Sequence, residues 1–307
     1  MTEMLRGLVV FTMQGRWQSA IVIAVMSLMA LMLPPVSYLA SGIVALCTLR
    51  AGPKEGITVL FIATAVFASV AMLLMAQPLL AGIFLISNWL PVYGISSILG
   101  YTRSLSMSLL VTTGIGVLLV VGAYIVLPSP AEWWLQMMEP MVKMLEAQPG
   151  WKLGQAETQL FVTTLSSVMT GLLVAGLFAN IVLGLLLGRA WQAMLYNPMS
   201  FAEEFQQLRL GKVPAIVMMV TTATGLLAGS SVPLLQDCLP ILIVLFVVQG
   251  LAVTHAIVRL QQRHKAWLIV MYVLLLIMTS QMAVLLALIG VLEQWFNFRQ
   301  GSLEQDE

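Results

Sequence analysis

The sequence predicts an all-α fold: a polytopic bundle of about nine transmembrane helices whose N-terminus lies inside the cell. Three observations support this prediction. First, 60% of the residues are hydrophobic and only 9% are charged, whereas soluble domains contain roughly 25% charged residues. Second, the apolar residues gather in runs close to the length of about 20 residues that a helix needs to cross a bilayer. Third, the basic residues concentrate in alternate loops. We treat residues 1–307 as one integral membrane domain.

The first two runs are separated by a pair of prolines. Trp17–Leu33 follows two arginines and is followed by Pro34-Pro35 rather than by a small-residue cleavage site, so we expect an uncleaved span. Val36–Leu49 is only 14 residues long and rises about 21 Å. The alternative is that the prolines kink one long helix, which leaves eight spans.

Seven further runs lie between loops that carry charged residues or prolines, and each is long enough to cross a bilayer or nearly so. In chain order they are Gly56–Ala76, Leu79–Leu99, Ser104–Leu127, Gln159–Gly188, Val213–Ser231, Cys238–Val258 and Ala266–Leu292.

The positions of the basic residues favour nine spans over eight. With nine alternating spans, eleven of the 14 Lys and Arg residues lie in inner loops, which agrees with the positive-inside rule. These eleven are Arg6, Arg16, Arg50, Lys54, Arg103, Arg189, Arg209, Lys212, Arg259, Arg263 and Lys265; Lys143, Lys152 and Arg299 lie outside. Fusing the first two runs places either the N-terminal arginines or the later basic loops on the wrong face. The C-terminus is then expected outside.

Two segments between spans have amphipathic patterns. The outer segment 128–158 contains AEWWLQMMEPMVKML, in which tryptophans and methionines recur at helical intervals, as in a helix that lies in the membrane interface. The inner loop 189–212 contains a capping-box pattern, Ser200 with Glu203, which predicts a helix from Phe201 to Arg209. Phe201, Phe205 and Leu208 share one face of it. This helix either packs on its own bundle or, with Arg209, docks on a partner protein.

The inner loop also carries a resemblance. Gly188–Lys212 reads GRAWQAMLYNPMSFAEEFQQLRLGK, a Tyr-Asn-Pro turn followed by F-x-x-x-F-x-x-L-R. With the Gly-rich span before it, this string resembles the YybS-like family of bacterial polytopic membrane proteins, and the resemblance covers most of the chain. That family is distantly similar to the substrate-binding subunits of energy-coupling-factor transporters, although this chain has more spans. The resemblance implies a bacterial cytoplasmic (inner) membrane protein that captures a small vitamin-like molecule from the outer side.

Polar residues inside the spans are candidates for ligand contacts, because they are costly at membrane depth. Asn88 and Trp89 precede Pro91, and Tyr93 follows it. The proline loosens the helix, so an amide, an indole N–H and a phenol can converge on a small molecule. The alternative is a proline kink with aromatic packing. Asp237, between Pro233 and Pro240, is interpreted as part of an outer loop.

Small residues at four-residue spacing predict close helix packing in two spans. They are Gly176, Asn180, Gly184 and Gly188 in one span, and Gly225 and Gly229 in another.

Several functions are not expected from this sequence. The nearly balanced charge, 14 basic against 13 acidic residues, gives no field for nucleic acid. No catalytic or nucleotide-binding motif is present, so we expect no enzyme and no cofactor. Cys47, Cys238 and the histidines lack metal-ligand spacing.

Two hypotheses for the function follow. One is a transporter-class binding subunit that meets a separate ATPase chain, and the other is a non-catalytic scaffold or assembly factor that recruits proteins through its cytoplasmic helix.

Overall fold

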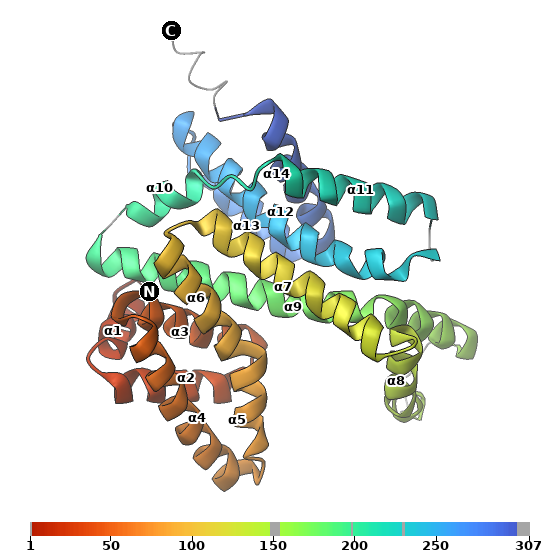
Figure 1. Cartoon of the computed structure of the whole chain (residues 1–307), viewed down its shortest axis with the longest axis horizontal. Helices are drawn as coiled ribbons and strands as arrows, with labels where there is room; N and C mark the ends of the chain where they lie inside the picture. Colours follow the sequence, from red (N-terminus) through yellow and green to blue (C-terminus); the bar gives the residue numbers. More distant parts are fainter. Residues whose placement is uncertain (1, 148–153, 198, 229–230, 300–307) are drawn as a thin grey trace. The chain divides into compact units, whose positions relative to one another are not determined.

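The computed structural model is all-α and describes residues 2–147, 154–197, 199–228 and 231–299 (Figure 1). The chain forms two compact units: residues 1–112 with 177–208, and residues 113–176 with 209–307. Two helices, α7 (Leu105–Val126) and α9 (Gln155–Tyr196), contribute residues to both units. We describe each unit by itself.

The first unit begins with a helical hairpin, as the charge argument predicts. After the short α1 (Thr2–Thr12), α2 (Arg16–Ala30) and α3 (Ser37–Ala51) are separate helices that pack on each other. A 3₁₀ turn, η1 (Pro34–Val36), joins them. The interpretation as one kinked helix is therefore wrong, because the prolines end the first helix and start a new one.

The next span contains a π-helical turn. Helix α4 (Pro53–Met75) precedes this span. The span itself consists of α5 (Leu79–Phe84), the π turn η2 (Leu85–Trp89) and α6 (Leu90–Thr102), which form one apolar stretch of 24 residues. Pro91 lacks an amide hydrogen and its ring clashes with the carbonyl four residues back. The helix widens there, and such π turns are frequent at functional sites.

Two helices connect the membrane-spanning segments. On the segment predicted to be outside, α8 (Pro130–Glu146) continues through Pro140 without a break. The inner loop holds α10 (Ser200–Gln206), which is shorter than predicted. The Ser200 hydroxyl bonds to the carbonyl of Asn197 (3.0 Å), so the predicted capping bond at this helix start is not made.

The second unit is built around α12 (Pro233–Leu260) and α14 (Thr279–Phe296), its most extensively packed pair of helices, with α11 (Lys212–Ala228) and α13 (Ala266–Ile277) beside them (Figure 1). Gly250 and Gly290 allow this close packing: a Cβ atom on Gly250 would overlap the backbone of Leu286, and one on Gly290 would overlap the backbone of Phe246.

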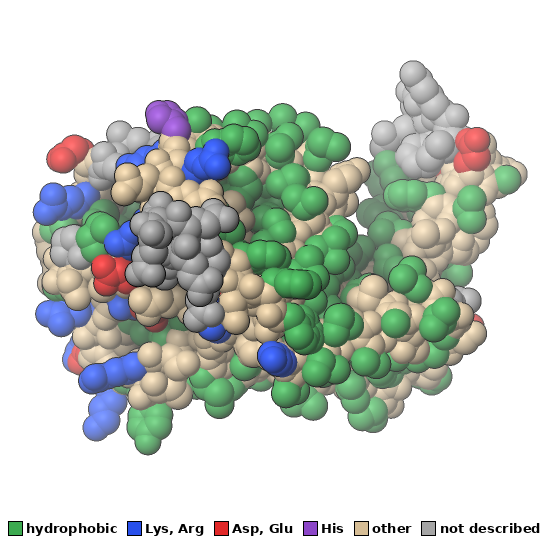
Figure 2. All heavy atoms as spheres, turned by 90° about the horizontal axis from the view of Figure 1, so that it is seen from above, with side chains coloured by type: hydrophobic (Ala, Val, Ile, Leu, Met, Phe, Trp, Pro, Cys, Tyr) green, Lys and Arg blue, Asp and Glu red, His purple; other side chains and the backbone are tan. Residues whose placement is uncertain are grey.

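Among the described residues, six helices are long and apolar enough to cross a membrane, while α2, α11 and α13 are shorter apolar helices. Much of the surface seen in Figure 2 is hydrophobic, and side chains such as Leu73 and Leu227 are more than four-fifths exposed. Exposed apolar area of this extent is typical of contact with lipid. The chain is thus a polytopic membrane protein.

The side of the membrane on which the C-terminus lies stays a prediction. The last apolar run is two helices that break at Met278. The amide of Gly211, just before α11, donates to Oε1 of Gln294, near the end of α14 (3.0 Å). This bond joins the start of α11 to the end of α14. The contacts of Gly250 with Leu286 and of Gly290 with Phe246 show that α12 and α14 run antiparallel.

Because α12 ends at the basic residues Arg259, Arg263 and Lys265, which are expected inside, the antiparallel α14 ends on the opposite face. We therefore predict that the C-terminus lies outside. Alkaline phosphatase fused after Glu307 should be active, as in the outside control fused after Ser129, and green fluorescent protein at that position should not fluoresce. A fluorescent protein fusion after Glu307 with an inactive phosphatase fusion would contradict this topology.

Candidate functional site

A cluster of hydrogen-bonded polar side chains lies among the apolar helices of the first unit. The fully buried hydroxyl of Ser41 is 2.6 Å from Oδ1 of Asn88 and 2.8 Å from Oδ1 of Asn180. The amide nitrogen of Asn180 donates to Ser37 (2.8 Å). The four residues come from α3, the π turn and α9. The cluster thus joins three segments that are far apart in the sequence.

Two donors at the π turn have no hydrogen-bond partner within the described residues. One is Nδ2 of Asn88, which lines a cavity of about 260 Å³ together with Pro34, Ser37 and Phe84. The other is the indole Nε1 of Trp89, which is fully buried. An unpaired buried donor costs about 1–3 kcal/mol. The π turn therefore presents unused hydrogen-bonding capacity.

The structure separates the residues that the sequence grouped as ligand contacts. Asn88 lines the cavity, and the Pro34 turn is beside it. Trp89 packs edge-on against Phe67 (5.9 Å between ring centroids) and lies 6.2 Å from Phe84, so it lies behind the cavity wall. Tyr93 is half-buried and is not among the residues that line this cavity.

Close contact between α3 and α9 sets the position of the cluster. A Cβ atom on Gly188 would lie 2.5 Å from Cβ of Ala45, and one on Gly184 would overlap Ser41. These two glycines therefore lie at a helix contact, as expected. Gly176 and Gly225 do not, because a Cβ atom there would meet nothing within 4 Å. Gly229 lies outside the described residues.

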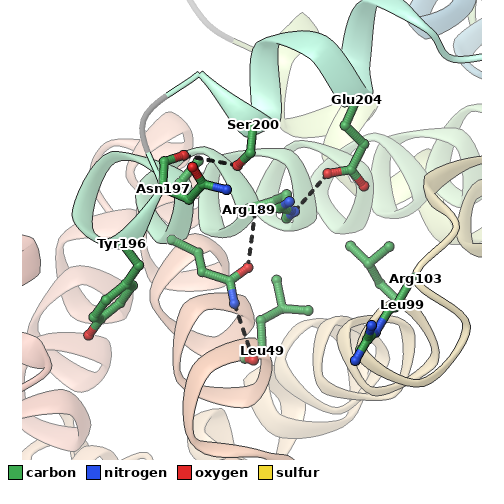
Figure 3. A pocket seen from close by; sticks show the side chains of 11 residues that line it. Leu49, Leu99, Arg103, Arg189, Tyr196, Asn197, Ser200 and Glu204 are labelled. Atoms are coloured by element: carbon green, nitrogen blue, oxygen red, sulfur yellow. Dashed lines mark hydrogen bonds and ion pairs between the residues drawn. The ribbon is translucent and has the colours of Figure 1, made fainter.

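A second cavity lies at the other end of the same helices, where α3, α6 and α9 finish (Figure 3). Its volume is about 440 Å³. Arg189 forms an ion pair with Glu204 of α10 (2.8 Å) and bonds to Gln192 (3.3 Å), which donates to the carbonyl of Leu49 (3.3 Å). The remaining lining includes Arg103. The sequence-based prediction does not include this cavity; the signal that could have indicated it is that Arg103 and Arg189 lie at or near the ends of apolar runs.

The residues predicted to contact a partner are only partly accessible. Leu208 is 2% exposed, and Phe201 and Phe205 are half-buried with their rings stacked at 5.7 Å. Arg209 is exposed. The ion pair between Glu204 and Arg189 holds α10 on α9.

Asp237 is a buried helical residue, so its assignment to a loop is wrong. Pro233 starts α12, and Pro240 is accommodated inside this helix. The Asp237 carboxylate is 1% exposed and accepts hydrogen bonds from the Tyr124 hydroxyl (2.7 Å) and the Gly171 amide (2.9 Å). Asp237 therefore ties α7, α9 and α12 together within the second unit.

Comparison of the chain with known protein families, with curated proteins and with solved structures finds no match. Cys47 and Cys238 are both free. Within the described part of the chain, no group of three or more His, Cys, Asp or Glu side chains is arranged to hold a metal ion.

Proposed function

We propose that this chain is a transporter-class membrane protein that binds a small, largely apolar molecule beside Asn88. The observation that supports this proposal is the π turn, where Asn88 lines a cavity and its amide nitrogen has no hydrogen-bond partner among the described residues. A bound molecule with a polar atom would accept a hydrogen bond from this nitrogen. The volume of about 260 Å³ favours a small ligand, since drug-sized ligands occupy roughly 300–1,000 Å³.

Helix packing alone is a weaker explanation for the polar cluster. A hydrogen bond between transmembrane helices contributes only about 0.6–2 kcal/mol. The glycine contacts already hold α3 on α9 at Gly184 and Gly188. Asn88 adds an amide whose nitrogen makes no hydrogen bond within the described residues. A ligand partner explains why an amide rather than an apolar side chain occupies this position.

Ligand binding at Asn88 is testable by thermal unfolding of the detergent-purified protein against a panel of vitamins and nucleobases. We expect at least one compound to raise the unfolding temperature of the wild type. Asn88→Leu keeps the side-chain size but removes the polar contacts. It should therefore lower the affinity for this ligand about tenfold, which corresponds to the loss of one hydrogen bond between uncharged groups, about 1.4 kcal/mol. Ser87→Ala is the matched control, because its hydroxyl already donates to the Ile83 carbonyl (2.7 Å).

The scaffold hypothesis predicts a different outcome in the same experiment. The double variant Phe201→Ala, Phe205→Ala should then lose a co-purifying protein, and no compound should stabilise the wild type. If no compound shifts the unfolding temperature, or if Asn88→Leu responds as the wild type does, the binding proposal is contradicted.

A further inference from the structure

The cavity at the ends of α3, α6 and α9 concentrates cationic side chains. Arg103 and Arg189 line it, with Glu204 as its single lining acid (Figure 3). The guanidinium of Arg50 lies over the ring of Tyr196, another lining residue, at 4.0 Å from its centroid. The cavity therefore has more positive than negative side chains around it.

Arg103 adopts an unfavourable backbone conformation, and its side chain makes no polar contact within the described residues. It caps the C-terminus of α6 in the left-handed region (φ 53°), where glycine or asparagine is usual. A non-glycine residue with positive φ is uncommon. Its guanidinium makes no hydrogen bond or ion pair within the described residues. The position therefore holds an arginine although a smaller residue suits the backbone better.

Arg189 is held in place before any ligand arrives. Its Nε faces Glu204 and its Nη1 faces Gln192, which is itself tied to the Leu49 carbonyl. Within the described residues, Nη2 has no partner, so this nitrogen remains able to donate to a ligand. A guanidinium fixed by its neighbours loses little side-chain entropy when it binds.

An anion in this cavity would be held by direct contacts with the guanidinium groups rather than by the net charge around it. The ends of α3, α6 and α9 each carry roughly half a negative charge, and these offset part of the arginine charge. The long-range field is therefore weak. Recognition must come from short hydrogen bonds, and guanidinium forks match the oxygen spacing of phosphate.

We infer that this cavity binds a phosphate group through Arg103 and Arg189, with Gln192, Asn197 and Ser200 as further polar lining residues. The group belongs either to a soluble phosphate monoester or to the headgroup of an anionic lipid. The site is separate from the cavity beside Asn88, so it does not depend on the proposed function.

The experiment uses the full-length protein and two kinds of probe. Inorganic phosphate and glycerol 3-phosphate, measured by calorimetry in detergent, test the soluble source. Nanodiscs of phosphatidylglycerol against phosphatidylcholine, followed by native mass spectrometry of the retained lipid, test the headgroup source. We expect one arm to show binding that saturates at one phosphate per chain.

Arg103→Asn separates a ligand role from a structural one. Asparagine tolerates the left-handed conformation better than arginine does, so this variant should unfold at the same or a higher temperature. Its phosphate affinity should fall at least tenfold. Arg263→Gln, at an exposed position outside the cavity, should bind as the wild type does. Absence of binding in both arms, or wild-type affinity in Arg103→Asn, overturns the inference.

Discussion

Replacing Gly188 by leucine is expected to lower the free energy of unfolding by about 3 kcal/mol or more, at the upper end of the range for overpacking. A Cβ atom at this position would lie 2.5 Å from Cβ of Ala45 and 2.8 Å from the carbonyl oxygen of Gly42. Backbone atoms cannot rotate away, so α3 must shift from α9 and the polar cluster must separate. The measurement is the unfolding temperature in detergent, which should fall by about 6 °C or more.

Gly176→Leu is the matched control on the same helix. A Cβ atom there meets nothing within 4 Å, and leucine favours a helix more than glycine does by almost 1 kcal/mol. We therefore expect Gly176→Leu to be neutral or slightly stabilising. Equal losses in the two variants would show that the close contact between α3 and α9 is not the cause.

Asp237→Ala is expected to destabilise the second unit by about 2–6 kcal/mol. Removal of the carboxylate leaves the Tyr124 hydroxyl and the Gly171 amide without their acceptors, and each unpaired buried group costs about 1–3 kcal/mol. Chemical or thermal unfolding followed by circular dichroism measures this loss.

The companion variants separate the two hydrogen bonds of Asp237. Asp237→Asn keeps one acceptor oxygen and should lose less stability than Asp237→Ala. Tyr124→Phe removes a single hydroxyl bond and should cost about 0.5–1.5 kcal/mol, or up to about 3 if the carboxylate is charged. Wild-type stability in Asp237→Ala would mean that Asp237 does not tie α7, α9 and α12 together.

The sequence predicted the parts of the fold that depend on local patterns. The apolar runs identify the long helices, and the prolines at 34 and 35 mark a real turn between α2 and α3. The spacing of Gly184 and Gly188 correctly indicates a close helix contact. These features follow from composition and spacing along one segment, so a single sequence contains them.

Other features depend on contacts between distant segments. Ser41 and Asn180 are 139 residues apart, and nothing local links them. The break at Met278 has no glycine or proline to mark it, so the sequence predicts one span where the structure has α13 and α14. The prolines around Asp237 resemble a loop, yet proline is favourable at the first helical position and Pro233 occupies it.

The central claim is that the cavity beside Asn88 holds a small molecule. The most direct measurement is native mass spectrometry of the wild type, Asn88→Leu and Arg103→Asn after purification in detergent. We predict that the wild type and Arg103→Asn carry one bound molecule of constant mass, and that Asn88→Leu carries it at clearly lower occupancy, as expected from an affinity about tenfold weaker. A folded wild type that carries only detergent and membrane lipid would contradict the claim.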